Sequence, residues 1–443
     1  MRKHVASVLC GVFLFLSMKT FAGGVDLDVR DVTTQYGINY WYVHENSLPI
    51  VSVSMAFKHA GSLYDPDGKK GLASLAASLV LRGTTKDGEN IGRRLREQGV
   101  ALGISVDKDN LYIRLKALAE NLDFALSMIG YSLVKAPVED VSFLTEKELQ
   151  KAVIRRNVGD PAELADGMLS KILFGDSPHA YQIEGSVETV DKITLGDIND
   201  YRNISFDLDK MVVSVVGDVS SEAVSSMLDM YFSGLARGQN KRVVDKAVPN
   251  VGLRGYVHHE APQSVIVFAA NGISRKDDNY PLAEVLSNAI GRGNSLTSVL
   301  MRELRGKRGI TYRVMASMQH MEGVDLFSGL LYTDGSTAEE GVEALLETIE
   351  SVRTNGIDKS TFNVAIANIV NSFTYAFLDT ASAAATLTDL QMLGFDTDYI
   401  KEHGTKYRSI NLQDVNKFAK SFLGGFTIVE VGETSHIGAT VLS

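Results

Sequence analysis

The residue types that most often carry out catalysis are few in this sequence and poorly spaced for it. The nine histidines include no pair three or four residues apart, which is the spacing that a zinc site on one helix requires. His258, His259 and Glu260 stand between a predicted strand and Pro262, so we interpret them as a surface turn. We interpret His179 as a hydrogen-bonding residue of a loop. The histidines therefore predict no metal site in this chain.

Nucleophilic catalysis and phosphate binding are equally unsupported. Ser74 and Ser78 lie in a predicted helix without the Gly-x-Ser-x-Gly turn that exposes a nucleophilic serine, and serines that pack a helix explain them better. The single cysteine, Cys10, lies in an apolar N-terminal run. Gly291 and Gly293 are not followed by the Lys-Ser/Thr pair of a phosphate-binding loop.

One stretch nevertheless has the form of an enzyme active site. Gly61–Thr84, GSLYDPDGKKGLASLAASLVLRGT, resembles the active-site segment of the pitrilysin/insulinase family of zinc peptidases, with a turn and an apolar helix from Gly71. In that family the helix carries His-x-x-Glu-His, in which two histidines bind zinc and the glutamate activates the metal-bound water. Here the three positions are occupied by Ser74, Ala77 and Ser78.

A later predicted helix also lacks a zinc ligand of the family. The family's third zinc ligand is a glutamate seven residues after a supporting glutamate, and the matching stretch is Glu146–Pro161. If Glu148 is the supporting residue, the ligand position holds Arg155, a permanent cation with no lone pair for a metal. The resemblance therefore implies a chain that binds no zinc and does not hydrolyse peptides alone.

Two catalytic residues of the family remain. In LRGKRGITY, Arg305 and Tyr312 match an arginine and a tyrosine that reach the zinc centre of the opposing domain, hold the substrate and stabilise the oxyanion. A guanidinium and a phenol placed where negative charge develops lower the barrier. Gly309 is expected to end the helix, so that Tyr312 starts a strand beside Arg305. The alternative is a solvated helix arginine and a core tyrosine.

The first half of the chain mixes strands and helices. Alternating stretches at Tyr36–His44 and Ile50–His59 predict two neighbouring strands of a sheet. Further strands are predicted at 101–107, 110–118 and 211–217, and helices at 71–81, 91–98, 122–133, 140–157 and 193–201.

The second half repeats this order. Ser264–Ala270 corresponds to the strand at 50–59, and Tyr280–Ile290 to the helix at 71–81. LGDINDY at 195–201 recurs as LQDVNKF at 412–418, and each is followed by a strand. We therefore predict an α+β fold of two homologous α/β-roll domains, the half-clamshell of the pitrilysin/insulinase family. The predicted units are a signal peptide at 1–22, domains at 23–235 and 251–443, and a linker at 236–250.

The N-terminus predicts export. Arg2 and Lys3 precede an apolar run from Val5 to Met18 that is short for a membrane span, and Ala22 offers a small-residue cleavage site. We therefore expect a periplasmic protein, with an uncleaved anchor as the alternative. Cleavage removes three basic residues and no acidic ones, which takes the formal net charge from −10 to −13. An acidic chain of this kind is not expected to bind nucleic acid.

The leading functional hypothesis is a non-catalytic subunit of a zinc peptidase. Its partner would be a homologous chain with an intact His-x-x-Glu-His and bound zinc, and its substrate an unfolded peptide held by Arg305 and Tyr312. A second hypothesis is a peptide-binding or assembly scaffold with no peptidase partner. A third is an independent hydrolase that uses other residues.

Overall fold

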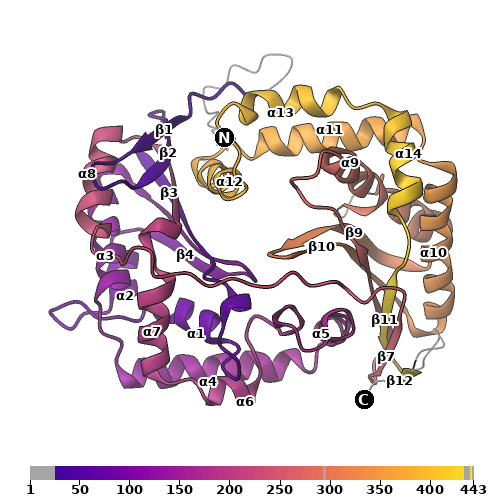
Figure 1. Cartoon of the computed structure of the whole chain (residues 1–443), viewed down its shortest axis with the longest axis horizontal. Coiled ribbons are helices and arrows are strands. Elements are labelled where there is room, and N and C mark those ends of the chain that lie inside the picture. The colour runs from indigo at the N-terminus through magenta and orange to yellow at the C-terminus, as the bar shows by residue number, and fades with distance from the viewer. Residues whose placement is uncertain (1–24, 293–295, 434–439, 442–443) are drawn as a thin grey trace, which may run out of the picture.

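Two six-stranded sheets, one from each half of the chain, form the framework of the molecule (Figure 1). The computed structural model describes residues 25–292, 296–433 and 440–441. The predicted signal peptide at 1–22, with Cys10, lies outside the described residues. In the described part, no helix is both long enough and apolar enough to cross a membrane. The mixture of helices and sheets confirms the α+β class.

The first sheet has one parallel pair, β2 with β6, and is otherwise antiparallel. The prediction that the first two long strands are neighbours is wrong, because β6 lies between β2 and β3. β6, MVVSVVG, is apolar along most of its length, and such a strand belongs inside a sheet with both faces covered. The strands in spatial order are β1 (Arg30–Thr33), β2 (Asn39–His44), β6 (Met211–Gly217), β3 (Ile50–Lys58), β5 (Asn110–Leu118) and β4 (Ala101–Val106).

Helices cover the outer face of this sheet. Its core is formed by alternate residues of the strands, such as Val53 and Met55 of β3, which pack on Leu75, Leu126 and Leu228 from the helices. Alternate residues of a strand point to one face, so the remaining side chains face the other half. The helices of the first half, of which all but α5 lie on the side of this sheet, are α1 (Leu72–Leu79), α2 (Ile91–Glu97), α3 (Leu122–Val134), α4 (Asp140–Asn157), α5 (Pro161–Phe174), α6 (Val187–Asp191), α7 (Leu195–Ser205) and α8 (Ser221–Phe232).

Five strands of the second sheet repeat five of the first in order and direction. β7 is parallel to β11, and β8, β10 and β9 follow in antiparallel succession, as β3, β5 and β4 do. The edge strands differ, because β12 is parallel to β7 whereas β1 is antiparallel to β2. This shared topology confirms the internal repeat. The strands in spatial order are β12 (Thr440–Val441), β7 (Arg254–His258), β11 (Thr427–Gly432), β8 (Gln263–Asn271), β10 (Val324–Asp334) and β9 (Thr311–Met321).

Helices of the second half enclose its own core around Phe268, Phe327 and Leu345. A π-helical segment, η5 (Met301–Lys307), precedes β9. The helices are α9 (Tyr280–Gly291), α10 (Ala338–Asn355), α11 (Lys359–Tyr375), α12 (Thr380–Met392), α13 (Tyr399–Arg408) and α14 (Leu412–Phe422).

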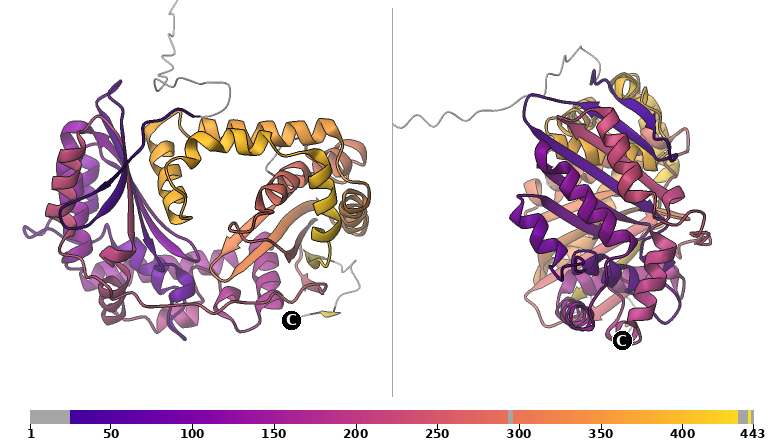
Figure 2. Two further views of the ribbon diagram at one scale, coloured as in Figure 1. Left: turned by 45° about the horizontal axis from the view of Figure 1, so that its top comes forward. Right: turned by 90° about the vertical axis from the view of Figure 1, so that its left-hand side faces the viewer.

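Each half contributes one helix to the inner face of the other half's sheet. α5, from the first half, packs on β8 and β11 through Leu169 and Leu173. α12, from the second half, packs on β3 and β6, where Thr388 Oγ1 and Ser214 Oγ lie 3.0 Å apart. Figure 2 shows the two sheets on opposite sides of the molecule, with these helices on their inner faces. The halves are thus joined by exchanged helices as well as by the chain.

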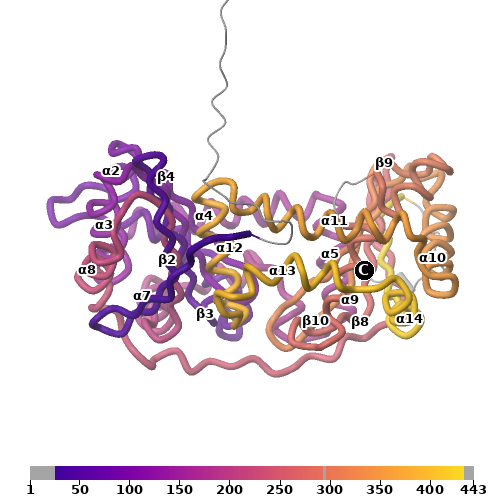
Figure 3. The backbone as a smooth tube through the Cα atoms, turned by 90° about the horizontal axis from the view of Figure 1, so that it is seen from above, coloured from indigo at the N-terminus to yellow at the C-terminus, as the bar shows by residue number. Residues whose placement is uncertain are grey.

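A stretch without helix or strand, residues 237–253, connects the halves along one side of the molecule (Figure 3). Arg242 fixes it to the first half, because its guanidinium donates to the His59 carbonyl (3.1 Å) and to Ser205 Oγ (2.6 Å). The guanidinium also lies over the Tyr64 and Tyr201 rings. This connection is therefore held against the first half at its start.

A second contact joins the two halves at the turn between β9 and β10. The Glu322 N–H donates to Asp109 Oδ1 (2.8 Å), and the Glu322 carbonyl accepts from His179 Nε2 (2.7 Å). Ser177 Oγ lies 2.9 Å from His179 Nδ1, and His179 is 1% exposed. His179 is thus a hydrogen-bonding loop residue. We name Asp109, His179 and the Glu322 peptide the inter-half clasp.

Candidate functional site

The side chain of Asp65 caps the N-terminus of helix α1. The Asp65 carboxylate accepts hydrogen bonds from the backbone N–H groups of Gly71 (2.8 Å) and Ala73 (2.9 Å). A carboxylate is favourable there because the first N–H groups of a helix have no partner within it. Lys70 Nζ donates to the Asp65 carbonyl (2.7 Å). These contacts fix the helix that would carry the catalytic motif.

The Asp65 carboxyl contacts this helix directly, but it is closed to a substrate. Burial raises its pKa to about 7, against the lowering effect of the Ala73 and Gly71 N–H groups and of the Lys70 and Arg242 cations. The residue is only 4% exposed. Asp65 therefore titrates near neutral pH, and its role is to cap α1.

The three positions of the lost zinc motif lie on α1 as inert side chains. Ser74 is half-buried and Ala77 is buried, whereas Ser78 is exposed and donates from Oγ to the carbonyl of Leu75 (2.9 Å). Among the described residues, no His, Asp or Glu side chain is hydrogen-bonded to either serine hydroxyl. Neither serine has the neighbouring base that a nucleophile needs.

Two polar residues of α4 contact the α1 segment, and the sequence reasoning missed both. Glu146 pairs with Arg82 just after α1, with Oε1 and Nε 2.6 Å apart. Gln150 Nε2 donates to the carbonyls of Gly71 (2.9 Å) and Glu184 (2.8 Å). Both side chains satisfy neighbouring polar groups, so they act as structural contacts.

Arg155 and Glu148 lie on the other face of α4. Both are exposed, and Glu148 pairs with Lys151 at 2.5 Å. Residues seven apart do share a helix face, but the face that α4 buries carries Phe143 and Gln150. Glu148 and Arg155, the positions predicted from the seven-residue spacing, therefore lie on the exposed face of α4, whereas Phe143 and Gln150 lie on the buried face.

Arg305 and Tyr312 lie together in the second half, as predicted. Gly309 adopts φ +68° between η5 and β9, and Arg305 Nη1 donates to the Tyr312 carbonyl (3.3 Å). The Tyr312 ring is 5.5 Å from the Tyr332 ring and is 50% exposed. Among the described residues, none forms a hydrogen bond with its hydroxyl. The phenol is therefore available to a ligand.

The structure does not bring these two groups of residues together. α1 packs against α4, α7 and β4 in the first half, whereas Arg305 and Tyr312 are on η5 and β9 in the second (Figure 1). No three His, Cys, Asp or Glu side chains of the described residues are close enough to hold a metal ion. The degenerate positions on α1 and the pair Arg305 and Tyr312 therefore belong to different halves of the chain.

A model of a known protein family matches the part of the chain that contains Arg305 and Tyr312. Residues 192–369 match the model described as the peptidase M16 inactive domain. This segment runs from just after α6 into α11. It includes Arg305 and Tyr312 and excludes positions 74, 77, 78 and 155.

Two bacterial proteins are similar along almost their whole length. A Helicobacter pylori protein named non-peptidase homolog YmxG is 23% identical, over 95% of this chain and 96% of its own length. A Bacillus subtilis protein named uncharacterized zinc protease YmxG is 21% identical, over 88% of this chain and 95% of its own length.

Solved structures share the fold. A peptidase M16 inactive domain from Pseudomonas fluorescens superposes with a TM-score of 0.85 at 22% identity, over 92% of this chain and 99% of its own. A protease from Helicobacter pylori gives a TM-score of 0.83 at 17% identity, over 92% of this chain and all of its own. At these identities the similarity supports the fold alone.

Proposed function

We propose that this chain, an inactive homologue of the M16 (pitrilysin/insulinase) peptidases, is the non-catalytic subunit of a two-chain zinc peptidase. Its partner is a homologous chain with an intact His-x-x-Glu-His, which holds the zinc and activates the water. This chain binds an unfolded peptide and contributes Arg305 and Tyr312 to the partner's site.

The proposal rests on a difference between two groups of residues: the zinc-binding motif is lost, whereas the arginine and the tyrosine are present. Positions 74, 77 and 78 offer two serines and an alanine, whereas Arg305 and Tyr312 stand side by side and exposed. A tyrosine in the hydrophobic core would be covered, and an unrelated surface arginine would not hold the tyrosine's backbone. This geometry favours a role in binding over the alternative of a solvated arginine and a core tyrosine.

The chemistry of the pair suits an acyl-transfer transition state. The Tyr312 hydroxyl can donate to an oxyanion, and the N–H groups of Arg305 that do not bond to the Tyr312 carbonyl can bind substrate carbonyl oxygens. Both groups are neutral or positive donors aimed at negative charge. Neither can activate water, so hydrolysis requires the partner.

The decisive experiment is Tyr312→Phe in the reconstituted complex. Loss of one oxyanion donor should lower kcat by about 100-fold or more while assembly stays unchanged. Tyr375→Phe is the matched control, because Tyr375 is also exposed, at 63%, but lies on α11. Unchanged turnover in Tyr312→Phe would show that the phenol has no part in the reaction.

The partner and the compartment can be tested together. The tagged chain, purified gently from its native cells, should elute with a chain of similar size that carries His-x-x-Glu-His and zinc. N-terminal sequencing of the same material should start at Gly23, as expected of a periplasmic protein. A start at Met1 would instead favour a retained anchor.

A scaffold without a peptidase partner is the second candidate. Two findings favour it: the Helicobacter pylori relative is named a non-peptidase homolog, and a chain of complex III from Candida albicans superposes with a TM-score of 0.76 at 15% identity. This function predicts protein or peptide binding without turnover in any mixture, and recovery of the chain without a zinc-binding homologue.

A further inference from the structure

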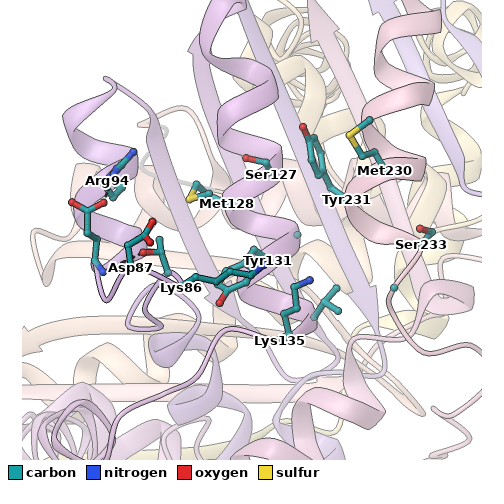
Figure 4. A pocket seen from close by; sticks show the side chains of 15 residues that line it. Lys86, Asp87, Arg94, Ser127, Met128, Tyr131, Lys135, Met230, Tyr231 and Ser233 are labelled. Carbon is teal, nitrogen blue, oxygen red and sulfur yellow. Dashed lines mark hydrogen bonds and ion pairs between the residues drawn. The ribbon is translucent and has the colours of Figure 1, made fainter.

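An open cleft lies on the outer helical layer of the first half, away from Arg305 and Tyr312. It has a volume of about 560 Å³ and lies between the loop at 85–89, α3 and the C-terminal end of α8. Volumes of about 300–1,000 Å³ are usual for small-molecule sites. Figure 4 shows the side chains that line it, which come from these three segments and, at Arg94, from α2.

The lining of the cleft is mixed, and methionine and tyrosine side chains supply its apolar part. Met128 and Tyr131 come from α3, and Met230 and Tyr231 come from the end of α8. Tyr231 is held in place because its hydroxyl donates to Asp123 Oδ1 (2.8 Å). Met230 is 67% exposed, so its side chain is accessible to a ligand. Flexible methionines beside aromatic rings fit ligands of varied shape.

The rim of the cleft carries two lysines without a carboxylate partner. Lys86 and Lys135 are exposed, and among the described residues neither forms an ion pair. Figure 4 shows both next to the Tyr131 ring, and Lys135 Nζ lies 5.7 Å from the ring centre. The neighbouring Glu89 is already paired with Arg94.

Asp87 is the opposing charge in this cleft. It is exposed on the loop at 85–89 and, among the described residues, forms no ion pair. The cleft therefore offers two free cations against one free anion, a modest excess of positive charge in an acidic protein. A ligand with one negative charge and an apolar body matches this arrangement.

We propose that the outer cleft binds a small amphipathic carboxylate of the fatty-acid type. Its apolar chain lies against Met128, Tyr131 and Met230, and its carboxylate lies at Lys86 and Lys135. Because the cleft is on the opposite face of the first sheet from α12, this binding is independent of peptide binding by Arg305 and Tyr312.

The test uses the full mature chain and 11-(dansylamino)undecanoate, whose fluorescence rises on entry into an apolar site. Decanoate should displace the probe, and the uncharged decanol should displace it less well. Equal displacement by acid and alcohol, or no binding of the probe, would overturn the proposal.

Variants locate the site. The double variant Lys86→Ala/Lys135→Ala should weaken decanoate binding by about tenfold and leave decanol binding unchanged. Asp87→Asn should tighten decanoate binding, and Met230→Asp should weaken the binding of both ligands. Lys401→Ala, at an exposed lysine of α13, is the control and should change nothing. A double variant that binds decanoate as the wild type does would place the carboxylate elsewhere and refute the assignment.

Discussion

Gly71 is held in a conformation and a space that only glycine fits. Its φ is +97°, and a Cβ there would lie 2.2 Å from the carbonyl oxygen of Glu184. Gly68, three residues earlier, also has a positive φ, +76°, but a Cβ there would meet nothing within 4 Å. An alanine at Gly68 would therefore introduce backbone strain alone, whereas an alanine at Gly71 would introduce both backbone strain and steric overlap.

We expect Gly71→Ala to destabilise the protein far more than Gly68→Ala. The strain of a left-handed residue alone costs about 1 kcal/mol, which is the expected effect at Gly68. At Gly71 the loop at 184–185 must also move, so the loss should be about 3 kcal/mol or more. Urea unfolding measures both values. Equal losses would mean that the contact with Glu184 is easily relieved.

Asp65 should make stability depend on pH in an unusual direction. Its folded pKa of about 7 is above the usual value of 3.8, so the folded state binds the proton more tightly than the unfolded state. The contribution of Asp65 is therefore greatest below about pH 4 and falls as the pH rises to about 7. Most aspartates in folded proteins, with lowered pKa values, act in the opposite sense.

The measurement compares the wild type with Asp65→Asn between pH 4 and 7. The free energy of unfolding of the wild type, relative to the variant, should decrease across this range by up to about 4 kcal/mol, since each pKa unit corresponds to about 1.4 kcal/mol. A constant difference between the two proteins would show that Asp65 does not titrate in this range.

At the scale of elements, α5 is the clearest case of a helix that stabilises a sheet far from it in sequence. Leu173 is 1% exposed and packs on the second sheet. We expect Leu173→Ala to lower the free energy of unfolding by about 2–5 kcal/mol through the cavity that it leaves.

The matched control is Leu149→Ala on α4, because Leu149 is 51% exposed. It should change stability by less than about 0.5 kcal/mol. Limited proteolysis shows which half of the protein is destabilised. Leu173→Ala should increase cleavage in the second half, although the substitution is in the first. Cleavage confined to the first half would argue against the exchanged contact.

The sequence predicted most of the long helices and strands, but not which segments pack beside them. α4 spans residues 140–157 as predicted. α5 was missed, although Asp160 before Pro161 is a helix-start signal and Asp160 Oδ1 accepts from Ala162 N–H (2.8 Å). The positions of β6 and α12 could not be predicted, since periodicity shows that a face is buried but not which segment covers it.

The candidate site was predictable to a similar extent. The proximity of Arg305 and Tyr312 followed from a short spacing and one glycine. The contacts of α1 with Glu146 and Gln150 depend on which face of α4 turns inward, and seven-residue spacing fits two faces equally well. The outer cleft could not be recognised as a motif in the sequence, because its residues come from separate segments.

At the scale of the whole molecule, the inter-half clasp is a hydrogen-bonded contact between the two halves. Burial raises the pKa of Asp109 to about 6, so its carboxylate is ionised above that pH and is then a strong acceptor for the Glu322 N–H. We expect Asp109→Ala to release this amide, and hydrogen exchange of the peptide containing Glu322 and Gly323 should become at least about tenfold faster.

Asp87→Ala is the control for this experiment, because Asp87 is an exposed aspartate remote from the second half. His179→Ala should also accelerate exchange in the turn, since it removes the partner of the Glu322 carbonyl. Unchanged exchange in both clasp variants would mean that the exchanged helices alone hold the halves together.

The exchange of α5 and α12 also has a consequence for synthesis on the ribosome. The first sheet is complete once β6 has emerged, but the helix that covers its inner face ends only at Met392. α5 emerges even earlier, before every strand on which it packs. The nascent chain must therefore carry an uncovered sheet face from the end of β6 to the end of α12, and an apolar helix α5 until the strands of the second half follow. Export in an unfolded state would remove the need to protect them in the cytoplasm.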